Sequence, residues 1–157
     1  MGSMAEGAAG TIPDLTDPRI FQLWIRDRVR YADLDTNSHV NNVSYAVYCE
    51  SGRIAFYDAF IRPLIAPGHG WLVARVAIDY RSEMRFPGDV EIGVRVMAVG
   101  RTSVRKGYAV FQDGVCAATM ESVCVHRDRA AGASVPWNEA LRARLDALAR
   151  AAGPVAP

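Results

Sequence analysis

The sequence predicts an α+β domain in which an antiparallel sheet of five strands wraps around one long buried helix, with a second helix near the C-terminus. Residues 43–60 have a helical repeat and are apolar on most of their circumference, as is typical of a buried helix. One strand-like segment precedes this stretch, and four follow it with little chain between them. A sheet that covers a single apolar helix is an α+β arrangement. Because one helix leaves part of such a sheet uncovered, we expect a homodimer or homotetramer.

The length and charge of the chain exclude several classes of function. Its 157 residues favour a single domain with a sizeable core. With 18 Lys and Arg residues against 17 Asp and Glu, the net charge of +1 gives no electrostatic reason for binding nucleic acid. No apolar run approaches the roughly 20 residues that cross a bilayer, so we expect no membrane association.

The cysteines and the N-terminal residues indicate a cytoplasmic protein. Cys116 and Cys124 lie on one predicted strand, roughly 26 Å apart, which is too far for a disulfide. Residues 1–17 lack the charged and apolar regions of a secretory signal. The opening Met1-Gly2-Ser3-Met4 resembles a cloning scar ahead of a native start at Met4. We expect the Gly-, Ala- and Pro-rich tail over residues 1–18 to be disordered. A reducing compartment is therefore expected.

The first predicted elements open a main domain over residues 19–130. Residues 21–31 alternate apolar and polar side chains and predict a strand. Residues 32–42 are dense in turn-forming residues and predict a loop. The long helix follows, with Asn41 or Asn42 as its natural N-cap.

The later elements are four strands and a helix. Two prolines and two glycines over residues 62–70 end the long helix. Asp113-Gly114 is a strong signal for a two-residue hairpin turn. The C-terminal segment, residues 131–157, contains an amphipathic helix that we expect to cover the sheet edge. The predicted ranges are 71–81, 90–99, 104–112 and 115–126 for the strands and 137–150 for the helix.

The polar loop before the long helix is where the sequence indicates chemistry. Asp35, Asn37 and His39 occur at every second position. In an extended segment these side chains project to one side and could converge. The helix N-terminus that follows presents unpaired backbone N–H groups that can stabilise an oxyanion. Together they form a set suited to hydrolysis by acyl transfer. The alternative interpretation is a polar turn with an asparagine cap.

Calcium binding is a third interpretation of this loop, and it fails. Asp33, Asp35 and Asn37 match the first three ligand positions of an EF-hand loop. The required glycine, however, is replaced by Ser38, and the position of the bidentate glutamate falls on Ser44. We therefore expect no metal site.

The segment RYADLDTNSHVNNVSYAVYCESGR, residues 30–53, resembles the signature of hotdog-fold thioesterases of the 4-hydroxybenzoyl-CoA thioesterase class. Within it, residues 35–42 also match the active-site segment of acyl-ACP thioesterases. The resemblance covers roughly residues 20–130 and includes the Phe86-Pro87-Gly88-Asp89 turn and the segment over residues 100–103. One departure is Ser38, where many members have glycine.

This resemblance implies a hotdog fold and hydrolysis of an acyl-CoA or acyl-ACP thioester by water, without a cofactor. Asp35 matches the catalytic carboxylate, which acts as general base or as nucleophile. Asn37 would hold the carbonyl or the water, and His39 would accept or relay the proton. The substrate carbonyl would be polarised by backbone N–H groups near Val40 and Asn41, and the substrate-binding set also includes Asn42 and Tyr45.

The resemblance also suggests where the carrier binds. It implies that the phosphate end of CoA contacts the segment that contains Arg101, Thr102, Ser103 and Arg105. With Lys106, these arginines form a basic cluster whose other interpretation is a solvated turn. Two rival functions remain open on this fold: an enoyl-CoA hydratase or dehydratase, and a non-catalytic acyl-CoA-binding protein.

The other polar and reactive residues have structural interpretations. Glu50 and Arg53 fit an ion pair within the long helix, with a direct part in positioning water as the alternative. Tyr45 and Tyr48 are expected as core or dimer contacts, with pocket lining as the alternative. The three cysteines have no neighbouring base and are interpreted as packing residues.

Overall fold

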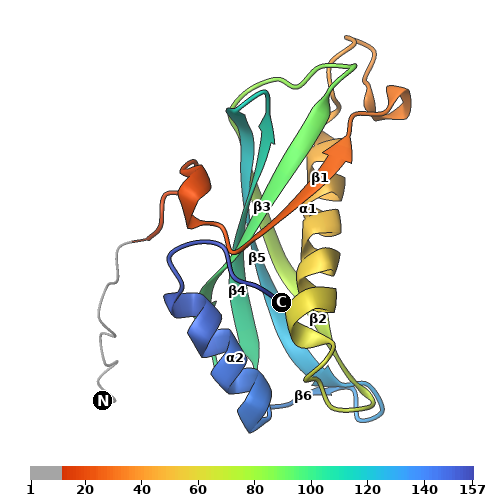
Figure 1. Ribbon diagram of the computed structural model, residues 1–157. Helices are drawn as coiled ribbons and strands as arrows, with labels where there is room; N and C mark the ends of the chain where they lie inside the picture. Colours follow the sequence, from red (N-terminus) through yellow and green to blue (C-terminus); the bar gives the residue numbers. More distant parts are fainter. Residues whose placement is uncertain (1–11) are drawn as a thin grey trace, which may run out of the picture.

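The computed structural model describes residues 12–157, which form a curled antiparallel sheet around a long helix (Figure 1). The five main strands run in the order β1-β3-β4-β5-β2, and a two-residue strand, β6, pairs with the end of β5. The predicted fold class is therefore confirmed. The elements are β1 (Leu23–Arg28), α1 (Asn42–Phe56), β2 (His69–Tyr80), β3 (Asp89–Val99), β4 (Ser103–Gln112), β5 (Val115–Asp128), β6 (Ala133–Ser134) and α2 (Glu139–Arg150). Residues 1–11, which include the expected cloning scar, lie outside the described residues.

The helix α1 begins where the sequence predicts. The side chain of Asn41 accepts a hydrogen bond from Val43 N–H at 3.0 Å and caps the helix. A π-helical turn, Tyr57–Ile61, extends α1 to the end of the predicted range. Gly52 lets the helix lie close to β3, because a Cβ at this position would sit 2.9 Å from a methyl group of Val94.

The core lies between α1 and the inner face of the sheet. Alternate residues of β3, namely Val90, Ile92, Val94 and Val96, are fully buried against it. Each such side chain contributes roughly 1.5–3 kcal/mol by leaving water. The opposite face of α1 exposes apolar side chains in the single chain, namely Val43, Val47 and Ile54. The expectation of an apolar, buried helix is thus met on one face only.

The outer face of the sheet carries a smaller core built from the N-terminal segment. Phe21 and Phe111 are buried there, and Leu15 packs against them. The Phe21 ring lies directly on Gly93, where any Cβ would collide with it. Residues 12–18 therefore differ from the expected disorder: they form a turn that leads into a short 3₁₀ turn, Pro18–Ile20.

The helix α2 covers the part of β3 that extends beyond β1. Three leucines, Leu141, Leu145 and Leu148, join the main core. Gln22 ties the junction together: its side chain accepts from Val96 N–H at 2.8 Å and donates to the carbonyl of Leu148. The position of α2 beside the sheet edge agrees with the expected covering role. No helix within residues 12–157 has the length and apolar character needed to span a membrane.

The strand ends differ locally from prediction. The first strand is shorter than residues 21–31, because a 3₁₀ turn, Tyr31–Asp33, begins the loop before α1. The predicted β4–β5 hairpin is confirmed, with positive φ angles of 51° at Asp113 and 77° at Gly114.

The strand β2 forms one edge of the sheet, and no strand within residues 12–157 pairs with its outer side. Three large apolar side chains on it are about half exposed: Leu72, Val76 and Tyr80. Such an edge offers unpaired backbone groups and apolar area to another strand.

Candidate active site

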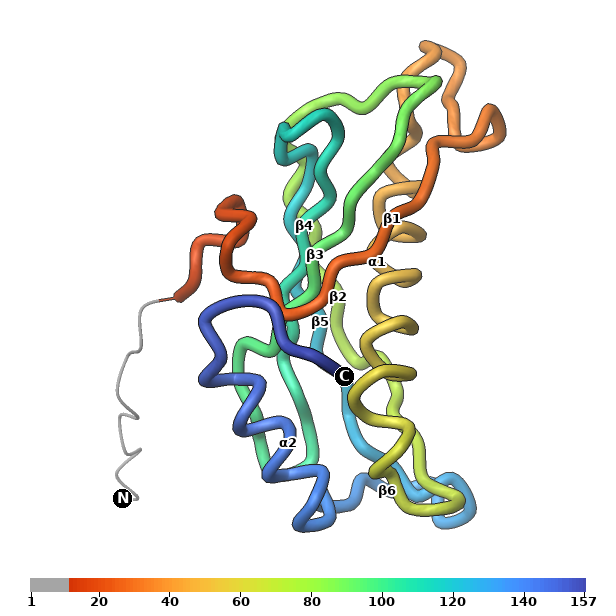
Figure 2. Tube along the Cα trace, viewed as in Figure 1, coloured from red at the N-terminus to blue at the C-terminus, as the bar shows by residue number. Residues whose placement is uncertain are grey.

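A groove of about 430 Å³ lies at the N-terminus of α1. The loop before the helix and the chain that follows β2 form its two walls. Figure 2 shows these two segments together at one end of the molecule. The lining residues are Asp35, His39, Val40, Asn42, Tyr45, Tyr80, Arg81, Ser82 and Glu83.

The Asp35 side chain is held by a tight turn rather than by an extended segment. Its Oδ1 atom accepts backbone hydrogen bonds from Asn37 at 2.8 Å and from His39 at 3.2 Å. The turn closes through Asp35 N–H and the carbonyl of His39 at 2.9 Å. Ser38 has a left-handed φ of 61°, a conformation that glycine adopts without strain. Oδ2 accepts no hydrogen bond from residues 12–157 and is available to a ligand.

The turn separates the three polar side chains that alternation would bring together. His39 lines the groove with Asp35, whereas Asn37 is exposed and lies outside the lining. Across the groove, Glu83 places Oε2 3.5 Å from Nε2 of His39. Sequence reasoning missed Glu83, because it follows a strand 44 positions after His39 in a stretch of ordinary charged residues.

The backbone donors at the start of α1 differ from those expected. Val40 N–H donates to the carbonyl of Met84 at 3.1 Å, and Asn41 N–H donates to the carbonyl of Asp33 at 2.8 Å. Both are therefore unavailable to polarise a substrate. Asn42 N–H, by contrast, has no acceptor within residues 12–157 and belongs to a residue of the groove wall. It is the free donor at the positive end of the α1 dipole.

Tyr45 fixes the opposite wall. Its hydroxyl donates to the carbonyl of Ser82 at 3.1 Å and accepts from Met84 N–H at 3.1 Å. Burial raises the pKa of the Tyr45 hydroxyl, so it stays protonated at neutral pH. Tyr45 is thus both a core residue and a lining residue, and it connects α1 to the segment that carries Glu83.

A buried network supports the floor of the loop. Asp33 accepts a 2.6 Å hydrogen bond from Tyr48 and a 3.1 Å bond from the Arg30 side chain. Burial alone would raise the pKa of the Asp33 carboxyl, but the bonds from Tyr48 and Arg30 and the guanidinium charge outweigh it, so the pKa is lowered. Asp33 is therefore a charged residue that holds the loop in place.

The expected ion pair between Glu50 and Arg53 also forms, with 2.7 Å between the charged atoms.

The expected CoA segment lies at the other end of the same chain. The β3–β4 turn that holds Arg101, Thr102 and Ser103 sits beside α2 (Figure 2), where Trp137 donates to the carbonyl of Gly100 at 3.0 Å. Arg105 lies 4.0 Å from Glu121. Within one chain, none of these residues reaches the Asp35 groove.

Lys106 corrects the expectation of a solvated basic cluster. It is fully buried, and its Nζ lies 4.1 Å from the centre of the Trp71 ring.

The interpretation of the cysteines as packing residues agrees with the burial of Cys49. Burial raises the pKa of this thiol to about 12, so it is not a nucleophile at neutral pH. Within residues 12–157, no group of three His, Cys, Asp or Glu side chains is arranged to hold a metal ion.

A family model described as the thioesterase-like superfamily matches residues 29–145. The chain belongs to this superfamily. Solved structures of the same fold include a thioesterase from Thermus thermophilus complexed with coenzyme A and zinc. It is 33% identical, the match covers 83% of this chain and 96% of that one, and the TM-score is 0.72. A thioesterase-superfamily protein from Jannaschia sp. CCS1 is 29% identical, with 83% and 85% covered and a TM-score of 0.73.

Other matches agree with the superfamily assignment and do not identify a narrower class within it. The PA5185 protein of Pseudomonas aeruginosa PAO1 is 27% identical, with 82% of this chain and 92% of that one covered and a TM-score of 0.71. A search of curated proteins finds no match. The hotdog fold and the thioesterase-like superfamily are established, and the narrower 4-hydroxybenzoyl-CoA class stays a prediction.

Proposed function

We propose that this chain is a thioesterase of the 4-hydroxybenzoyl-CoA class that hydrolyses an acyl-CoA to the free acid and CoA. The observation that carries the proposal is that Asp35 and Asn42 line the same groove. The carboxylate has a free oxygen and the N–H has no protein acceptor within residues 12–157. A thioester carbonyl placed between them would meet a base and an oxyanion donor together.

The reaction follows from these groups. Asp35 removes a proton from water, and the water oxygen attacks the thioester carbon. Asn42 N–H and the α1 dipole stabilise the negative oxygen of the tetrahedral intermediate. The C–S bond then breaks, and His39, which is paired with Glu83, supplies or relays the proton that the leaving thiolate takes up. The alternative in which Asp35 attacks the carbon directly passes through an anhydride that water hydrolyses.

A second copy of the chain is part of this proposal. The groove is open, and Tyr80 at one end of β2 belongs to its wall. Antiparallel pairing of two β2 edges would bury Leu72, Val76 and Tyr80 and would continue the sheet across the dimer. The partner would then close the groove with the opposite end of its own β2.

The carrier that we favour is CoA, with acyl carrier protein as the alternative. Support comes from the Thermus thermophilus relative, whose structure holds coenzyme A. In the antiparallel dimer, the β3–β4 segment of one chain would approach the groove of its partner. We therefore propose that this segment contacts CoA bound in the partner's groove, through Arg101, Thr102, Ser103 and Arg105.

The three cysteines are free, which fits the cytoplasmic location that we propose.

Release of free thiol from a series of acyl-CoA esters, from acetyl to palmitoyl with benzoyl and phenylacetyl, tests the function. Asp35→Asn is the matched variant, because its amide oxygen can still accept the turn hydrogen bonds. We expect hydrolysis that peaks for one acyl class and falls about 10²–10⁴-fold in the variant. Water addition to an enoyl-CoA without thiol release would favour the hydratase, and binding without turnover would favour the acyl-CoA-binding protein.

A further inference from the structure

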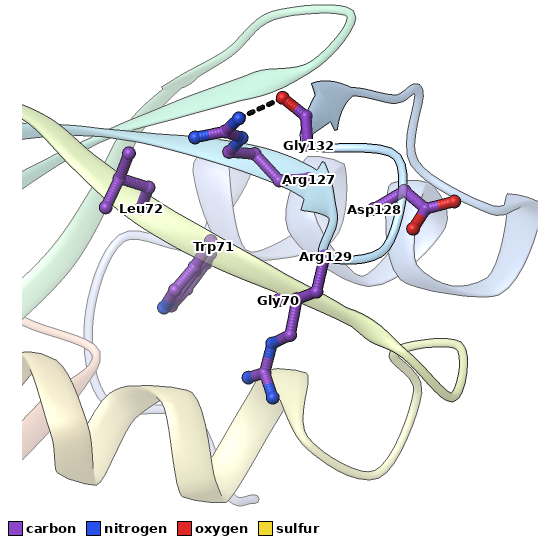
Figure 3. Close-up of a pocket in the computed structure, with 7 residues that line it drawn as sticks. All are labelled: Gly70, Trp71, Leu72, Arg127, Asp128, Arg129 and Gly132. Atoms are coloured by element: carbon purple, nitrogen blue, oxygen red, sulfur yellow. Dashed lines mark hydrogen bonds between the residues drawn. The ribbon is translucent and has the colours of Figure 1, made fainter.

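Two histidines outside the groove, His69 and His126, lie against each other at the opposite end of β2. His69 begins β2 and His126 lies near the end of β5, and Nδ1 of His69 is 3.2 Å from Nε2 of His126. His126 is 1% exposed, and His69 is half-buried. Figure 3 shows this end of the sheet, where Arg127, Asp128 and Arg129 follow His126 along the chain. No function assigned so far uses the histidine pair.

Hydrogen bonds determine which nitrogen of each ring carries the proton when both rings are neutral. Nδ1 of His126 lies 3.0 Å from the carbonyl oxygen of Val135 and 3.1 Å from that of Pro136. Because a carbonyl oxygen only accepts, Nδ1 of His126 carries the proton and Nε2 holds a lone pair. His69 therefore donates its Nδ1–H to that lone pair. Every ring nitrogen of His126 has a partner in this arrangement.

His126 holds the linking segment, residues 129–138, which joins β5 to α2. Both carbonyl acceptors of the ring belong to this segment, and the backbone carbonyl of His126 accepts from Val135 N–H at 3.0 Å. The ring also stacks on Trp137, with 4.7 Å between ring centres and 11° between the planes. Trp137 in turn donates to the carbonyl of Gly100. Displacement of the His126 ring would therefore free the chain that leads into α2.

The pair has room for one added proton but not for two. The first enters at Nε2 of His69, which forms no hydrogen bond within residues 12–157, and the bond between the rings is kept. The second has to enter at Nε2 of His126, because Nδ1 of that ring is already protonated. Two charged rings would then direct N–H groups at each other across 3.2 Å. The doubly protonated pair has to separate.

Charged groups on the elements around the pair are mostly cations. They are Arg101 in the β3–β4 turn, Lys106 on β4, Arg127, Asp128 and Arg129 after His126, and Glu139 and Arg142 on α2. Asp128 is the cross-strand partner of His69, so its carboxylate favours the first proton on that ring. Burial lowers the pKa of His126, and the charge of His69 adds to this effect against the carbonyls of Val135 and Pro136. A second charge is therefore opposed on several sides.

We propose that His69 and His126 form a pH-sensitive latch, which is closed while the pair carries at most one added proton and opens when both rings are charged. The closed latch holds the linking segment and Trp137 against the sheet. Because the pKa of His126 is lowered from the ordinary 6.5, the unfolded chain binds more protons than the folded one below that pH. The free energy of unfolding should therefore fall as pH falls below 6.5. The latch does not depend on the proposed thioesterase function.

The indole N–H of Trp137, which is hydrogen-bonded in the closed latch, reports on it in the full chain. As pH is lowered from 7 to 4.5, NMR should show that its protection against solvent exchange, relative to free indole at the same pH, falls about tenfold. Circular dichroism checks that the sheet remains folded, and urea unfolding measures the loss of stability. Protection that persists until the whole chain unfolds would overturn the latch.

His69→Asn tests whether the pair is the sensor, because asparagine places an uncharged amide nitrogen where His69 has Nδ1. The amide donates to neutral His126 and, after rotation, accepts from the charged ring, so the latch should stay closed at low pH. We expect the protection of Trp137 to become independent of pH in this variant and to remain as in wild type at pH 7. His39→Asn, which removes the histidine of the groove, should open as wild type does. Opening of His69→Asn at the same pH as wild type would show that the histidine pair is not the sensor.

Discussion

His39 and Glu83 face each other across the groove, with Nε2 and Oε2 3.5 Å apart, although 44 positions separate them in sequence. His39 is fixed by the Asp35 turn, and Glu83 follows a segment that Tyr45 ties to α1. The backbone that carries each member of the pair is therefore held in place by hydrogen bonds on its side of the groove. A carboxylate at this distance can orient the imidazole and stabilise it when it carries a proton.

Glu83→Gln should lower kcat by about tenfold while KM changes little, because the glutamine keeps the shape but loses the charge that supports His39. Steady-state thiol release measures both constants. Glu50→Gln is the matched control, since Glu50 pairs with Arg53 on α1 and lies outside the groove. Unchanged kcat in Glu83→Gln would remove Glu83 from the proton relay.

Asn42→Pro should reduce kcat about 10²–10³-fold, which is the usual effect of removing one oxyanion donor. Proline deletes the free N–H and is well tolerated at the first helical position. The preceding residue, Asn41, already has φ −59° and ψ 139°, which are compatible with a following proline. Thiol release at saturating substrate measures the effect.

Asn42→Ala separates the backbone donor from the side chain. It keeps the N–H and removes the amide, so it should retain near wild-type kcat. Circular dichroism of both variants checks that α1 is intact. If alanine and proline reduced kcat equally, the side chain of Asn42 would be the functional group and the backbone proposal would fail.

The sequence predicted the architecture well because local patterns determine it. The alternation in β3, the Asp113-Gly114 turn and the Asn41 cap each specify their element without distant contacts. The packing of residues 12–18 could not be predicted, because their composition gives no periodicity and their order comes from Leu15 and Phe21 contacting the outer sheet face.

The candidate site was predictable in residue type but not in geometry. Asp35 and His39 were identified from spacing and resemblance, yet the turn rotates Asn37 away and hydrogen bonds occupy Val40 N–H and Asn41 N–H. The acceptors of those bonds are the carbonyls of Met84 and Asp33, and the sequence around Val40 and Asn41 does not indicate such partners.

Lys106 could not be placed correctly from its neighbours either. A lysine beside an arginine suggests an exposed position, but the alternation of the strand directs its side chain inward.

Tyr48→Phe should destabilise the protein by about 1.5–3 kcal/mol at pH 7, because it removes a hydrogen bond to a charged carboxylate. The folded-state pKa of Asp33 is lowered, so its contribution is complete above the unfolded value of 3.8 and is lost as pH falls through the folded value. The difference between variant and wild type should therefore shrink below pH 3.8. Urea unfolding at pH 7 and at acidic pH measures it, with Tyr57→Phe as control.

Lys106 is the chain's single lysine, so its side chain gives one resolvable NMR signal. We expect this signal to titrate near pH 8, because burial lowers the pKa from 10.5 to about 8. Between pH 8 and pH 10.5 the unfolded chain binds more protons at this lysine than the folded chain does. The free energy of unfolding should therefore rise with pH in this range. Lys106→Met should lack this rise. A titration near pH 10.5 would show that water reaches the amine.

Val76→Lys should convert the proposed dimer to a monomer, because it places a charge on the apolar edge of β2, where Val76 is 45% exposed. Sedimentation velocity measures the mass, and thiol release should fall with dissociation, since the groove would lose its partner wall. Val115→Lys is the matched control: this valine is 55% exposed but lies beside the β4–β5 turn, away from the edge. A Val76→Lys protein that kept both wild-type mass and activity would show that the copies do not pair through β2.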